Sequence, residues 1–86
     1  IAAGVSFKGS QLQGAVFDSA DLRDAGFGDS DLRGATFRGA RLAYVDLDTA
    51  DLSPLSLARG ASKAVDFGDA DLTNVRRFRR RALAAA

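Results

Sequence analysis

Residues 5–47 read VSFKG SQLQG AVFDS ADLRD AGFGD SDLRG ATFRG ARLAY VDL, a series of five-residue blocks. The third place of every block holds Phe or Leu, and the first place holds Ala, Ser or Val. A period of five fits neither an α-helix nor a simple alternating strand. Within a block, however, places one and three are apolar or small while places two and four are mostly polar, which is the alternation of a very short strand.

Place five is often Gly, Asp or Ser, the residues that tolerate a sharp turn. Each block is therefore expected to form one side and one corner, and four blocks close a square coil of 20 residues. At that period Phe stacks mainly on Phe and small residues lie on small ones, as a packed interior requires. The predicted core stacks are Phe7, Phe27, Leu47 and Phe67; Leu12, Leu32, Leu52 and Leu72; Phe17, Phe37 and Leu57; and Leu22 and Leu42.

Blocks such as ADLRD, SDLRG, ADLSP and ADLTN resemble the pentapeptide-repeat family, whose repeat is A-(D/N)-L-x-x. The resemblance covers residues 5–75 and implies a right-handed quadrilateral β-helix, the hand that chains of L-residues favour. The chain is therefore predicted to be all-β, with a β-helix of about four coils over residues 1–75. A short C-terminal α-helix is predicted over residues 76–86, because Val75, Phe78, Ala82 and Ala85 fall on one helical face.

The third coil departs from the repeat, with Leu55 at a place for small residues and Ser62 at a core place. The five-residue phase returns at Val65 and Phe67 without insertion or deletion. We therefore expect a loosened or bulged side that still completes the square, with Pro54 at a corner. The alternative is a contact loop with Arg59 and Lys63 pointing outward.

Composition argues against catalysis. The chain has no Cys and no His, so the usual nucleophiles and bases are absent, and a prism of short sides offers no cleft that would tune a carboxylate. We expect no enzyme activity, no cofactor and no metal-dependent chemistry. No apolar run approaches the roughly 20 residues of a membrane span. Resemblance to bacterial family members implies a cytoplasmic location.

Charge is expected to distinguish the faces. Folded at 20 residues per coil, the sequence predicts an acidic ridge on two adjoining sides, made of Asp29, Asp31, Asp46, Asp48, Asp51, Asp66, Asp69 and Asp71. Three interpretations remain open for this ridge: a solvated face, a Ca²⁺ site at stacked carboxylates, or a surface that docks a protein with a basic groove. Two interpretations remain open for the basic tail, a lid or an anion contact, and the tail comprises Arg76, Arg77, Arg79, Arg80 and Arg81.

We expect a non-catalytic interaction or scaffold module whose partner is a protein with a basic surface, without sequence-specific nucleic-acid binding. Similarity to the quinolone-resistance members of the family implies an alternative, a DNA mimic that binds and protects DNA gyrase or another topoisomerase. Four coils spaced ~4.8 Å apart would span ~19 Å, over which B-DNA carries about eleven charges. Residues 1–75 carry a net charge of only −4. A third interpretation is a structural subunit that associates end to end through an uncapped N-terminal end.

Overall fold

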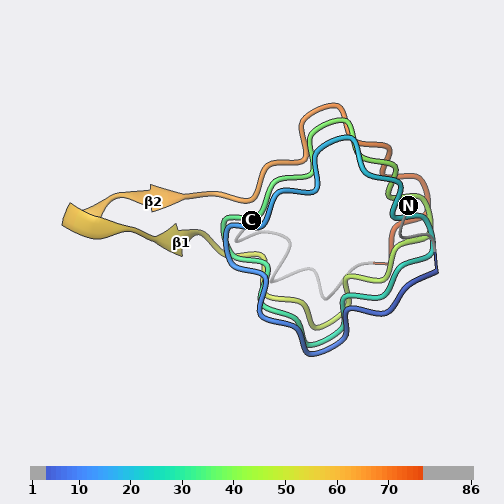
Figure 1. Ribbon diagram of the computed structural model, residues 1–86, viewed down its shortest axis with the longest axis horizontal. Coiled ribbons are helices and arrows are strands. Elements are labelled where there is room, and N and C mark those ends of the chain that lie inside the picture. Colours follow the sequence, from blue (N-terminus) through green and yellow to red (C-terminus); the bar gives the residue numbers. More distant parts are fainter. Residues whose placement is uncertain (1–3, 77–86) are drawn as a thin grey trace.

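The computed structural model describes residues 4–76. The chain winds into a four-sided β-helix, and its coils lie on top of one another when viewed along the coil axis (Figure 1). Up to Pro54, parallel pairing partners are 20 positions apart, as in Ser6 with Gly26 and Gln11 with Asp31. We number the sides of the coil in chain order: side 1 is 5–9, 25–29, 45–49 and 75–76; side 2 is 10–14, 30–34 and 50–54; side 3 is 15–19, 35–39 and 65–69; side 4 is 20–24, 40–44 and 70–74.

Every regular corner is a β-turn built from the last three places of one block and the first place of the next. The amide of the first residue donates to the carbonyl of the preceding place three, as from Ser10 to Phe7 at 3.1 Å. The residue at place five has positive φ in each regular block, from 74° at Gly4 to 51° at Asn74. This is the φ signature of a type II turn, which explains the preference for Gly, Asp and Asn at that place.

The interior holds two phenyl stacks on opposite sides of the square. Phe7 and Phe27 lie parallel on side 1 with ring centroids 5.0 Å apart, and Phe17 and Phe37 do so on side 3 at 5.2 Å. The two stacks touch edge to face across the coil, at 6.0 Å between Phe27 and Phe37. Parallel stacking at this spacing matches the distance between neighbouring strands, so the ladder and the rings enforce the same rise.

An arm interrupts the third coil between Pro54 and Val65. It contains strand β1 (Leu55–Ser56), the 3₁₀ turn η1 (Ala58–Gly60) and strand β2 (Ser62–Lys63). The strands pair antiparallel, and the hairpin projects sideways from the prism (Figure 1). We call residues 55–64 the arm. Its residues are exposed apart from Leu55 and Lys63, which are half-buried.

Pro54 explains why the coil opens at this point. It occupies place five, where the corner requires positive φ, and the proline ring fixes φ near −65°. Amides at place five elsewhere donate to the next coil, as from Gly9 to the Gly28 carbonyl at 2.9 Å, so a proline at this place also lacks a ladder donor. The sequence interpretation placed Pro54 at a corner and expected its missing amide to cost no ladder bond. It overlooked the dihedral constraint, which prevents the chain from turning into side 3.

The arm corrects the predicted register of everything after it. Beyond the arm, pairing partners are 30 positions apart: Thr36 pairs with Asp66, Arg41 with Asp71 and Asp46 with Arg76. Residues 55–64 were predicted to form a bulged side within the square, and this is wrong. Because ten residues equal two blocks, the insertion preserves the five-residue phase while moving all later residues by two sides.

The core stacks are corrected accordingly. Phe67 lies on Phe37 on side 3, with ring centroids 5.2 Å apart, and not above Leu47 as predicted. Leu57 was predicted to occupy that place, but it lies on the arm with 48% of its surface exposed. Leu72 follows Leu42 on side 4 instead of Leu52 on side 2. Before the arm, the ladder brings the predicted stacks together coil by coil, as far as Leu47 and Leu52.

The base of the arm packs on a corner made of glycines. An added Cβ on Gly34 would lie 2.8 Å from Cβ of Leu55 and 3.4 Å from the Lys63 carbonyl oxygen. Gly14 lies at the same corner one coil below. An added Cβ on Gly14 would be 3.8 Å from Cδ2 of Leu55. Glycine at this corner therefore leaves the space that the foot of the arm occupies.

The β-helix continues through Arg76, one residue beyond the predicted boundary. The Arg76 amide donates to the Val45 carbonyl at 2.8 Å, and its carbonyl accepts from the Leu47 amide at 2.8 Å. The remainder of the predicted C-terminal helix lies outside the described residues, as do Arg77, Arg79, Arg80 and Arg81 of the basic tail. Between residues 4 and 76 the chain forms no helix with the length and apolar character needed to traverse a bilayer.

Deleting residues 55–64 together with Pro54→Gly should leave a folded β-helix, because a glycine at this corner could adopt positive φ and turn directly into Val65. We expect a melting temperature within a few degrees of the wild type by circular dichroism. The same deletion with Pro54 retained should lose more than about 1 kcal/mol, since proline cannot adopt the required φ. Equal stability of the two deletion variants would contradict this account of the corner.

Phe67→Ala should destabilise the chain by about 3 kcal/mol, because it removes a ring stacked on the fully buried Phe37. Leu57→Ala should change stability by less than about 0.5 kcal/mol, because that side chain lies on the exposed arm. Urea unfolding of both variants measures the difference. A larger loss for Leu57→Ala would favour the register with an uninterrupted square.

Candidate functional site

Most outward-facing aspartates first serve the fold. An Asp at place two accepts a hydrogen bond from the backbone amide two residues later, at 2.8 to 3.3 Å, and so supports the turn that follows. The residues that do this are Asp21, Asp31, Asp46, Asp51, Asp66 and Asp71. Five members of the predicted acidic ridge therefore have a structural role in their own corners.

Arginine two positions later neutralises some of these carboxylates. Arg23 forms a bidentate pair with Asp21, with nitrogen to oxygen distances of 2.8 and 2.6 Å, and Arg33 does the same with Asp31. The hydrogen bonds from the Arg23 side chain lower the pKa of Asp21 to about 2, against a smaller opposing effect of partial burial. The pKa of Asp31 is lowered for the same reason, and that of Asp71 is lowered mainly by the Thr73 hydroxyl.

The structure divides the predicted acidic ridge between opposite halves of the prism. Asp66 lies on side 3 beside Thr36, Asp71 lies on side 4 beside Arg41, and Asp69 lies at the corner between them. The other members stay together on sides 1 and 2: Asp29, Asp31, Asp46, Asp48 and Asp51.

The prism is therefore not two-sided in charge, contrary to the prediction. Sides 1 and 2 carry five Asp against Lys8, Arg33 and Arg76, a net of −2 over the described residues. Sides 3 and 4 carry six Asp against three Arg, a net of −3. The arm adds Arg59 and Lys63, and no acidic residue lies between Asp51 and Asp66.

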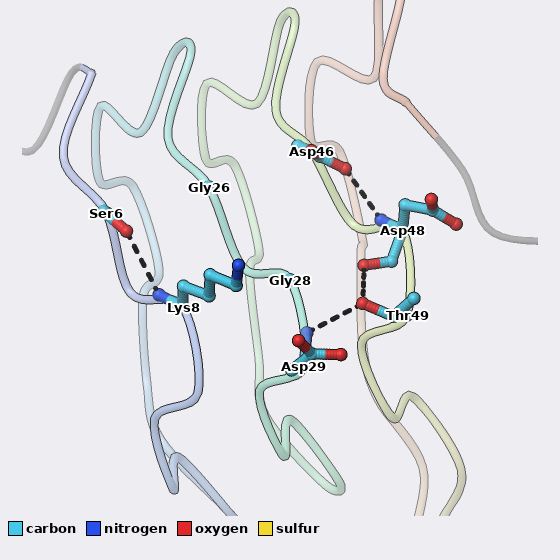
Figure 2. A pocket seen from close by; sticks show the side chains of 8 residues that line it. All are labelled: Ser6, Lys8, Gly26, Gly28, Asp29, Asp46, Asp48 and Thr49. Atoms are coloured by element: carbon cyan, nitrogen blue, oxygen red, sulfur yellow. Dashed lines mark hydrogen bonds between the residues drawn. The ribbon is translucent and has the colours of Figure 1, made fainter.

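Side 1 is hollowed where three coils meet. The hollow is open to solvent, has a volume of about 280 Å³ and is lined by residues from all three coils (Figure 2). Its floor is made by Gly26 and Gly28 of the middle coil, and the Lys8 side chain extends from the first coil toward Gly28 (Figure 2). Sequence reasoning missed this feature because it treated places two and four as mostly polar and inferred nothing from the glycines there.

The acidic wall of the hollow consists of Asp29, Asp46 and Asp48. Thr49 fixes this corner, because its hydroxyl accepts from the Asp29 amide at 2.9 Å and donates to the Asp48 carbonyl. Asp46 accepts from the Asp48 amide and faces Arg76 at 3.9 Å. Within residues 4–76, no side chain forms a hydrogen bond or ion pair with the carboxylates of Asp29 and Asp48.

A metal site at stacked carboxylates does not emerge from this arrangement. The Ca²⁺ interpretation depends on two Asp-x-Asp pairs, Asp29/Asp31 and Asp69/Asp71, and these lie at different corners. No group of three or more acidic, His or Cys side chains within residues 4–76 is placed to hold a metal ion. The hollow combines a lysine and carboxylates at its rim, which suits a basic or zwitterionic group of a partner better than a bare cation.

A family model for pentapeptide repeats matches residues 3–39 and 17–53 in eight copies. The chain belongs to the pentapeptide-repeat family. The match ends at residue 53, directly before Pro54 and the arm, although residues 66–76 beyond the arm pair with the coil again. No curated protein matched the chain.

A crystal structure of a pentapeptide repeat protein from the thylakoid lumen of Arabidopsis thaliana is similar to this chain, with a TM-score of 0.71 and 36% sequence identity. The alignment covers 86% of this chain but only 44% of that protein, so this chain spans less than half its length. The family fold is a right-handed β-helix, and the square coil described above is of that fold.

Asp21 should titrate at about pH 2, well below its ordinary 3.8, when followed by NMR of its carboxyl carbon. Because the folded-state pKa is depressed, the Asp21 carboxylate favours the folded state fully above pH 3.8, and this contribution disappears as the pH falls from 3.8 to about 2. Arg23→Gln should raise the midpoint towards 3.8. Arg38→Gln, which removes a cation on side 3, is the control and should leave it unchanged; an unshifted midpoint after Arg23→Gln would contradict the assignment.

Proposed function

We propose that this chain is a non-catalytic protein-interaction module, in which a stiff β-helix presents the arm to a protein partner. The observation that carries the proposal is that the arm contributes nothing to closing the coil. Side 3 resumes directly on the coil below, where the Phe37 amide donates to the Asp66 carbonyl at 2.7 Å. Because the β-helix closes without the ten residues of the arm, we infer that the arm has a role in binding rather than in the fold.

The arm is suited to docking because its base is fixed and its end is exposed. Leu55 packs into the corner at Gly34, while Leu57, Ala58 and Arg59 are exposed to solvent. A preorganised element loses little conformational entropy on binding. Charge defines the complementary surface: the arm carries Arg59 and Lys63 with no carboxylate, so its partner should offer carboxylates around an apolar contact for Leu57.

The hollow on side 1 is the second docking surface of the module. The sequence predicted a partner with a basic surface, and Asp29 and Asp48 at the rim of the hollow remain available for such a partner. The DNA-mimic alternative gains no specific support, since it needs carboxylates continuous along one side. Association through the N-terminal end stays a prediction, because residues 1–3 lie outside the described part.

Affinity capture from source cells with matched variants tests the role of the arm. The wild type is compared with three variants. The first lacks residues 55–64 and carries Pro54→Gly, the second carries Arg59→Glu/Lys63→Glu, and the third, Arg41→Gln on side 4, is the control. A captured protein is then purified and titrated against each variant by calorimetry. We expect affinity to fall at least tenfold for the first two variants and to be unchanged for the control. Equal affinity of the armless chain and the wild type would overturn the proposal.

A further inference from the structure

The end of the arm is a convex, basic projection. Its loop turns through Arg59 at φ 60° and ψ 32° and Gly60 at φ 76°, both in the left-handed region. The Leu57 amide donates to the Ala61 carbonyl at 2.8 Å, which closes the loop. Arg59 thus lies at the tip of a closed hairpin, with the half-exposed Leu57 at the start of the loop.

The hollow on side 1 has the complementary shape and charge. An added Cβ on Gly26 would meet no atom within 4 Å, so the space above this part of the floor is open. Above Gly28 the space is narrower, because an added Cβ there would lie 3.6 Å from the Asp48 carbonyl oxygen and 4.0 Å from Lys8 Cγ. The volume of about 280 Å³ leaves room for a guanidinium and its methylenes. Three carboxylates against Lys8 give the lining a net charge of −2, opposite in sign to Arg59 at the tip of the arm. Lys63 lies at the base of the arm, where it pairs with Leu55.

We propose that the hollow on side 1 of one copy receives the arm of a second copy, with Arg59 lying between the carboxylates of Asp29 and Asp48. This rests on the proposed docking role of the arm and names its partner. Asp21, Asp31 and Asp66 are less suitable, because they already pair with arginines of their own chain. Asp18, Asp24 and Asp69 form no such pair within residues 4–76, but they do not line the hollow. Guanidinium to carboxylate pairing in a partly enclosed hollow is a strong, directional contact.

The two surfaces lie on different parts of one molecule. The arm leaves the corner between sides 2 and 3 and projects away from the prism, while the hollow lies on side 1 (Figure 1, Figure 2). An arm therefore does not reach the hollow of its own chain. Because the contact joins two unlike patches, each added copy leaves one arm and one hollow unused, and association proceeds head to tail into chains or rings.

A nucleic acid is the less suitable occupant for the arm. Proteins that bind the phosphate backbone commonly neutralise about six to ten phosphates, and the arm offers two cations with an exposed leucine beside them. Carboxylates in a hollow with an uncharged glycine floor match that mixed chemistry better.

Sedimentation velocity over a range of protein concentrations, at low and high salt, tests the contact. For the wild type we expect species larger than a dimer, weakened by salt. Arg59→Gln/Lys63→Gln removes the arm's charge, Asp29→Asn/Asp48→Asn removes that of the hollow, and Gly26→Gln fills the hollow without changing charge. Each should weaken self-association at least tenfold. Lys8→Gln should strengthen it, and Arg41→Gln, the control on side 4, should leave it unchanged.

Mixing the arm variant with the hollow variant gives the sharpest test. The first retains an intact hollow and the second an intact arm, so the mixture should form a one-to-one dimer and nothing larger. A mixture that stays monomeric, or a wild type that stays monomeric at millimolar concentration, would overturn the proposal. A monomeric wild type that still captures another protein through its arm would refute self-association alone and leave the docking function standing. Arm-dependent binding to duplex DNA without self-association would likewise overturn it.

Discussion

The fold depends on one backbone requirement, a positive φ at the last residue of every block. Each regular corner meets it, even with Tyr44 and Thr49, side chains that rarely adopt such an angle. That Tyr44 and Thr49 adopt positive φ indicates that the backbone ladder and the phenyl stacks stabilise the coil enough to offset the unfavourable dihedral angle. Pro54 is the residue for which no such compromise exists, and the chain leaves the square there.

The sequence predicts the interior of the first two coils because their five-residue phase and their 20-residue columns agree. Phe on Phe and Leu on Leu leave little freedom in which residues point inward. After Pro54 the same reasoning fails, since an insertion of two whole blocks is invisible to a five-residue phase. A signal was available in the columns: placing Phe67 after Phe17 and Phe37 gives an unbroken phenyl stack, whereas placing it after Leu47 does not.

The candidate surfaces were less predictable for a different reason. Counting carboxylates cannot separate an Asp that supports its own turn, such as Asp51, from one that faces solvent without a partner side chain, such as Asp48. That difference depends on hydrogen-bond geometry within a side, and on which residues of the coil above lie alongside. The hollow is equally difficult to predict from the sequence. It exists because Gly26 and Gly28 have no side chains, while the neighbouring coils carry larger residues at the same places.

The ten residues after Pro54 also determine which way the rest of the chain faces. Wound into the coil, they would rotate every later side chain by half a turn about the axis and bring Asp66, Asp69 and Asp71 into line with the aspartates of sides 1 and 2. Held outside it, they keep those charges on the far half. The proline ring of Pro54 therefore determines the angular position of all later residues about the coil axis. As a result, the negative charges of the chain are spread over both halves of the prism instead of gathering on one.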